Sequence, residues 1–75
     1  MKVNKTQALL NIFYLLLKHK EITKEEIKSM IDISDVTFRR YMQEIRAFFF
    51  NFDIDLGIKY DRREDKYLLI SDKYI

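Results

Sequence analysis

The sequence lacks cysteine and proline, and its single glycine is Gly57. Without cysteine the chain cannot form a disulfide scaffold, a thiolate zinc site or a thiol nucleophile. The scarcity of residues that break regular structure argues against a disordered linker. We therefore expect residues 1–75 to form one folded domain, of a size that buries only roughly 60% of the surface of its unfolded chain.

The sequence also lacks a long hydrophobic run and a strong net charge. The apolar segment from Ala8 to Leu17 is interrupted by Asn11 and is too short to span a bilayer, so no membrane association and a cytoplasmic location are expected. The net charge is +2, but all five arginines lie between positions 39 and 63. Arginine makes forked contacts with phosphate and guanine that lysine cannot make. This clustering suits a nucleic-acid partner and is equally compatible with ordinary surface arginines.

Residues typical of catalysis are scarce. His19 is the only histidine, and it lies at the end of a predicted helix, where a cation suits the helix dipole. The sequence has no phosphate-binding glycine loop and no histidine or carboxylate cluster with metal spacing. We therefore predict that the protein is not an enzyme and needs no metal or cofactor.

Apolar residues at helical spacing predict three helices. The first covers residues 5–19. Thr23 and Glu26 form a capping box that starts the second, over residues 23–31, and Ser34 is the N-cap of the third, over residues 35–49. A longer helix followed by two capped helices with a tight turn between them is typical of a helix-turn-helix.

The last part of the chain changes to strand spacing. Residues 57–70 read as a β-hairpin, or wing, around a charged connector. The predicted fold class is α+β, a winged helix-turn-helix with three helices followed by a two-stranded β-hairpin wing. The segment Phe48–Phe52 either finishes the third helix or begins a strand, and we expect it to be covered by the first helix or by a second chain, because exposure would favour aggregation.

The third helix has a buried side and an outward side on a helical wheel. Phe38, Met42 and Ile45 share the buried side with Phe49. The opposite side is small or polar, so its N-terminal part could enter a major groove, with Arg40 on phosphate or guanine and Val36 on a thymine methyl group. The candidate DNA-binding residues, including those of the wing, are Ser34, Val36, Thr37, Arg39, Arg40, Gln43, Arg62, Arg63 and Lys66.

Two acidic residues on the third helix repel phosphates. Asp35 suits the helix N-terminus, and Glu44 is expected to pair with Arg40 one turn away. The first helix is apolar beyond its core face, which indicates either a dimer interface or coverage by later aromatic residues. The candidate dimer interface is Leu10, Tyr14 and Phe50.

Three segments resemble the DNA-binding domain of DeoR-type regulators. Residues 34–40, SDVTFRR, are similar to the S-x-x-T-[IV]-x-R signature, residues 21–27 to the second helix, and residues 58–69 to the wing. The match is closest to the N-terminal domain of regulators that carry a WYL sensor domain. The resemblance implies that Thr37 and Arg40 face DNA and that the protein is a homodimeric transcriptional regulator, with a separate sensor domain or partner protein.

The predicted function is therefore sequence-specific binding of double-stranded DNA in transcription regulation. The alternative is a winged-helix module that binds another protein without binding DNA, because fold alone does not decide function.

Overall fold

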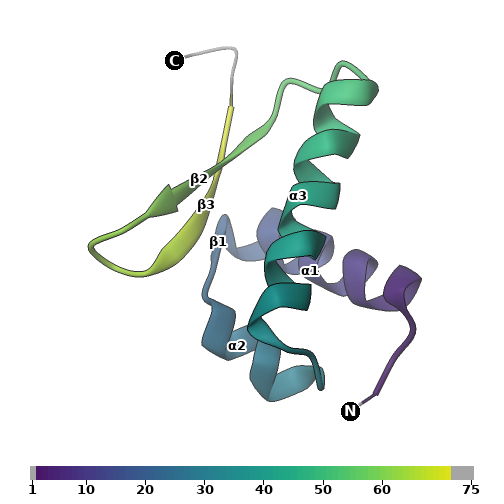
Figure 1. The fold of residues 1–75 in the computed structure, drawn as a ribbon. Helices are drawn as coiled ribbons and strands as arrows, with labels where there is room; N and C mark the ends of the chain where they lie inside the picture. The colour runs from purple at the N-terminus through teal and green to yellow at the C-terminus, as the bar shows by residue number, and fades with distance from the viewer. Residues whose placement is uncertain (1, 72–75) are drawn as a thin grey trace.

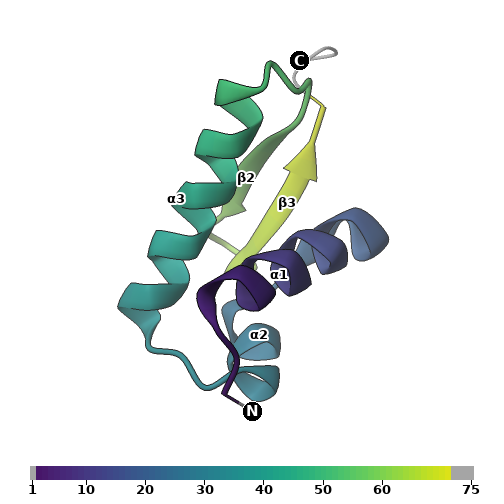
Figure 2. The same ribbon diagram turned by 90° about the vertical axis from the view of Figure 1, so that its right-hand side faces the viewer.

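A computed structural model describes residues 2–71 and shows a small α+β domain of three helices and three strands (Figure 1). The elements in chain order are α1 (Lys5–His19), β1 (Glu21–Ile22), α2 (Lys24–Met30), α3 (Asp35–Asn51), β2 (Gly57–Asp61) and β3 (Lys66–Ile70). Helices α1 and α3 cross on the same side of the β2–β3 hairpin, and α2 lies below them (Figure 2). The order of the elements is consistent with a winged-helix topology.

The three predicted helices are confirmed, and side-chain caps fix where they begin. Helix α1 has the predicted bounds, and the Asn4 side chain accepts a hydrogen bond from the Gln7 amide at 2.8 Å. The predicted capping box at α2 is present, so Thr23 is the cap and the helix starts one residue later than predicted. Helix α3 starts at the predicted residue and continues two residues further, to Asn51.

The sheet has three antiparallel strands in the order β1–β3–β2, so the prediction of a two-stranded wing was wrong in its strand number. The hairpin of β2 and β3 forms within the predicted range, and β1 adds to its other side through the pairs Glu21–Leu68 and Ile22–Tyr67. Lys20, in a left-handed conformation, ends α1 and turns the chain, and its carbonyl accepts a hydrogen bond from the Leu69 amide at 2.9 Å. A strand of two residues is too short to show alternation in the sequence, so β1 is recognised only from its pairing with β3.

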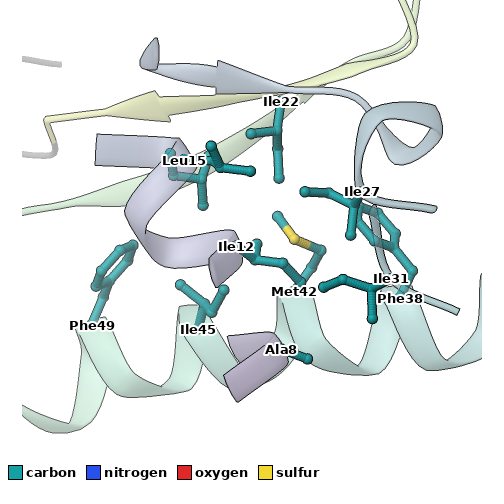
Figure 3. Close-up of a cluster of buried hydrophobic side chains, with 11 residues drawn as sticks. Ala8, Ile12, Leu15, Ile22, Ile27, Ile31, Phe38, Met42, Ile45 and Phe49 are labelled. Atoms are coloured by element: carbon teal, nitrogen blue, oxygen red, sulfur yellow. The ribbon is translucent and has the colours of Figure 1, made fainter. Parts of the chain in front are cut away.

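The core lies where α1, α2, α3 and the inner face of the sheet meet (Figure 3). Phe38 is fully buried, and its ring meets the Tyr67 ring edge-on at 5.4 Å between centroids. Ile22 and Ile27 are also fully buried, on either side of the Thr23 cap. Burying a large apolar side chain stabilises the fold by about 1.5–3 kcal/mol, so these residues hold α3 and the hairpin together.

The phenylalanine segment finishes α3 and does not begin a strand. Phe49 is buried, and Phe13 of α1 packs against both Phe49 and Phe48, with ring centroids 5.9 and 6.0 Å apart. Helix α1 covers only part of the segment, because Phe50 is 87% exposed and Phe52 is 69% exposed, and cover by a second chain stays a prediction. No helix within residues 2–71 is long and apolar enough to cross a membrane.

Candidate nucleic-acid interface

Helix α3 presents one side to the core and another to solvent. Phe38, Met42, Ile45 and Phe49 are buried. The opposite side, which we call the outer face of α3, consists of Val36, Arg40, Gln43 and Ala47, all of them exposed. No part of the described chain covers this face, so an approaching molecule can reach all four side chains.

The start of α3 is held by its own cap. The Ser34 Oγ accepts a hydrogen bond from the Thr37 amide at 3.1 Å and donates one to the Thr37 Oγ1, 3.0 Å away. Ser34 is therefore occupied by the helix end. The Thr37 Oγ1 accepts that hydrogen bond, so the Thr37 hydroxyl hydrogen remains available to donate to an approaching molecule.

Asp35 is neutralised by two lysines of α2. Its carboxylate forms ion pairs with Lys28 and with Lys24, the latter at 3.2 Å. Hydrogen bonds from Lys28 and Lys24 hold the pKa of the Asp35 carboxyl below its usual value, and the bond to Asp35 raises the pKa of Lys24. These pairs bridge the turn between α2 and α3 and offset the negative charge beside the outer face.

Glu44 does not pair with Arg40 as predicted. Its carboxylate lies 3.6 Å from the Lys5 ammonium at the start of α1. The prediction was wrong because α1 brings a lysine to Glu44 across the fold, a partner that spacing within α3 cannot reveal. Within residues 2–71, Arg40 forms no ion pair.

The turn between β2 and β3 projects away from the helices and carries Arg62 and Arg63, both exposed (Figure 1). The Asp61 carboxylate accepts hydrogen bonds from the amides of Arg63 and Glu64 at 3.0 and 3.2 Å. Asp65 has a left-handed backbone, with a φ of 52°. Two aspartates thus shape a turn that has no glycine, and aspartate is one of the few residues that tolerates these positions.

Lys66 lies apart from the two arginines. It is half-buried, and its ammonium is 2.6 Å from the carboxylate of Glu21 on β1. Side chains alternate across a strand, so Lys66 lies on the sheet face opposite Tyr67, which faces the core. The hydrogen bond with Glu21 raises the pKa of Lys66. The structure therefore does not bring Lys66 together with the other candidate DNA-binding residues.

A groove of about 370 Å³ lies between α3 and the hairpin. Arg39 lines it on the flank of α3, and Arg46 reaches across to donate a hydrogen bond to the Ile58 carbonyl at 3.4 Å. Tyr60 on the hairpin side donates a hydrogen bond to Asp65 at 2.6 Å, which raises the pKa of Tyr60. Arg46 was not among the candidate residues, although its spacing of seven from Arg39 places both on one flank.

The three candidate dimer residues are all exposed but do not share one surface. Leu10 and Tyr14 lie on α1. Phe50 lies on α3, at the edge of a hollow that Arg46 and Ile54 also line. Phe48 and Phe52, four residues apart, occupy the flank of α3 beside α1, a placement that helical spacing could have revealed.

Within residues 2–71, no group of three or more histidine or carboxylate side chains could hold a metal ion. His19 is exposed at the end of α1. The chain matches no protein-family model, no curated protein and no solved structure. The outer face of α3, its two neutralised acids and the arginine-bearing turn are thus the features from which a function can be inferred.

Proposed function

We propose that this chain is a winged helix-turn-helix domain of the DeoR type that binds double-stranded DNA and regulates transcription. Helix α3 would lie in the major groove, and the β2–β3 turn would contact the adjacent backbone or minor groove. The observation that carries the proposal is the outer face of α3, which is exposed and, from the start of the helix to Ala47, carries Val36, Arg40, Gln43 and Ala47.

The shape of this face fits the proposal. A helix with its side chains is about 10–12 Å across, and the major groove is about 12 Å wide. Val36 and Ala47 are small enough to permit close approach. Arg40 can pair with guanine or phosphate, and Gln43 and the Thr37 hydroxyl can bind base edges or phosphates.

The pattern of ion pairs supports DNA over an uncharged partner. Asp35 and Glu44, which would repel phosphates, are paired with lysines. Within the described range 2–71, the four arginines Arg39, Arg40, Arg62 and Arg63 form no ion pairs. Four phosphate contacts correspond to a slope of about −3 to −4 in a plot of log affinity against log salt concentration.

The test begins with a selection of bound duplexes from a random pool, followed by anisotropy measurements across a range of salt concentrations. Arg40→Ala is expected to weaken binding about 10- to 100-fold and to reduce the salt slope by about 0.9 if Arg40 contacts phosphate. Lys59→Ala is the matched control, because Lys59 is an exposed cation on the sheet face that points away from α3. A flat salt response, or equal effects of the two variants, would overturn the proposal.

The alternative proposal is a module that binds another protein and has no DNA target. It is favoured by the exposed apolar side chains Leu10 and Tyr14 on α1. It predicts a stable complex that substitutions on α1 disrupt and Arg40→Ala leaves intact, with no duplex recovered from the random pool. Both proposals give the chain a binding role with no catalytic step.

A further inference from the structure

Helices α1 and α3 expose a continuous apolar surface on the side away from the groove and the hairpin. We call it the apolar patch, and it consists of Leu10, Tyr14, Leu17, Phe48 and Phe52. Phe13 joins the two helices beneath it, since its ring meets the Phe48 ring edge-on at 6.0 Å, and the Phe48 and Phe52 rings are 5.3 Å apart. A hollow of about 300 Å³ beside Leu10 is lined by Leu9, Phe13, Ile45 and Phe48, with Glu44 at its rim.

The size of the apolar patch is what a dimer needs. Its five side chains are exposed by 61, 56, 39, 41 and 69% in chain order. With about 200 Å² per large side chain, these fractions correspond to roughly 500 Å² of apolar surface. Two copies would bury about 1,000 Å², which reaches the lower limit of a specific interface. A patch of this size is at the upper end for a monomer.

We infer that the apolar patch binds a second copy of this chain, with the two α1 helices packed side by side and antiparallel. The patch has a knob and a hollow: Leu10 and Tyr14 project from it, and the hollow lies next to Leu10. A two-fold axis near position 12 places Leu10 opposite Tyr14 of the second copy. Such an interface uses the same surface on both copies and therefore closes as a dimer.

The dimer leaves the candidate nucleic-acid interface uncovered. Phe48 and Phe52 lie on one flank of α3, Arg39 and Arg46 lie on the other, and the outer face is between them. The inference goes beyond the proposed DNA binding and does not depend on it, because self-association is measured without DNA. Loss of dimerisation and loss of DNA binding are therefore separate results.

The first experiment is sedimentation equilibrium of the 75-residue chain over a range of concentrations. The expected mass is that of a dimer at tens of micromolar and above. Phe52→Ser is expected to raise the dimer Kd about tenfold or more. The Phe52 ring of each copy is exposed in the monomer and buried in the dimer, so the variant loses the burial of two rings. Phe50→Ser is the matched control, since Phe50 is more exposed but lies outside the apolar patch.

A monomer at every concentration would overturn the inference and leave the apolar patch to a different protein or domain. Equal effects of Phe52→Ser and Phe50→Ser would overturn it as well. Circular dichroism of both variants checks that α3 remains folded, and Leu10→Ser on α1 gives a second variant should Phe52→Ser unfold.

Disulfide crosslinking gives a geometric test, and the absence of native cysteine makes its background clean. A mixture of Leu10→Cys and Tyr14→Cys chains is expected to crosslink faster than either chain alone. In the antiparallel register, Leu10 and its copy are offset by four residues, about 6 Å along the helix. Faster crosslinking of either variant with itself would indicate a parallel register and overturn the inference.

Discussion

Helix α3 contributes to two exposed surfaces of opposite character. Its outer face carries small and polar side chains around Arg40, whereas its flank beside α1 carries Phe48 and Phe52 in the apolar patch. Both surfaces are open to solvent, so exposure alone does not distinguish them. Their side chains distinguish them. The polar outer face of α3 suits a charged polymer such as DNA, and the apolar patch suits the same patch on a second copy of the chain. A single helix can therefore serve two binding roles without conflict.

The largest effect is expected from a substitution in the core, which destabilises α3 and with it both surfaces. Phe38→Ala is expected to destabilise the domain by about 3–5 kcal/mol, because it leaves a cavity beneath α3 where the ring now meets Tyr67. Chemical denaturation measures the loss. Phe50→Ala is the control for the same change at an exposed site and is expected to cost less than about 0.5 kcal/mol. Similar losses for the two variants would contradict the core assignment.

The next effect separates the surfaces. Val36→Glu places a carboxylate on the outer face in the first turn of α3, where an acid suits the helix dipole and leaves the fold stable. Duplex affinity is expected to fall about tenfold or more, because the carboxylate repels phosphate, while the sedimentation mass is unchanged. Val36→Thr keeps the size without the charge and serves as control. A change in mass would show that the two surfaces are not independent.

A smaller effect is expected from a substitution at Lys20, which changes the stability of the fold and lies outside both surfaces. Lys20 has a φ of 67° at the end of α1, a left-handed conformation that glycine adopts without strain. Lys20→Gly is expected to raise the free energy of unfolding by about 0.5–1 kcal/mol. Lys20→Ala keeps the strain and is the control for loss of charge. Chemical denaturation should show the higher free energy of unfolding for Lys20→Gly, while the duplex affinity and the sedimentation mass stay constant.

The smallest effect concerns the charge beside the outer face. Because Lys28 and Lys24 lower the pKa of Asp35, its ion pairs stabilise the fold above the unfolded pKa and are lost as pH falls through the folded pKa. NMR titration of the Asp35 carboxyl should give a midpoint below the ordinary aspartate value of about 3.9. Asp35→Asn should remove this part of the acid sensitivity, and Asp32→Asn is the control. An ordinary midpoint would contradict the ion pairs.

Local signals in the sequence predicted much of the fold. The caps at Thr23 and Ser34 and the apolar spacing of α1 and α3 act within a few residues, so the helices and the hairpin could be placed from sequence. Strand β1 could not, because Glu21 and Ile22 become a strand only by pairing with residues more than forty positions later.

The candidate site divides in the same way. The outer face of α3 followed from helical periodicity. The pairing of Glu44 with Lys5 and of Lys66 with Glu21 did not, because each joins elements that only the tertiary fold brings together. Phe50 was grouped with Leu10 and Tyr14, but it lies beside Arg46 and Ile54 on α3, and Phe48 is the neighbour that packs against α1. Neighbouring helix positions point about 100° apart, so adjacent phenylalanines reach different surfaces.

The order of strands in the sheet has a consequence for how the chain becomes a domain during synthesis. Its central strand, β3, is the last of the six described elements to be synthesised, yet it pairs with β1 and β2 and its Tyr67 covers Phe38. The helices therefore emerge before the strand that closes their core, and contacts between distant segments form slowly. The hydrophobic core of the nascent chain therefore stays incomplete until residues 66–70 are released, and the domain reaches its full stability only after β3 has paired.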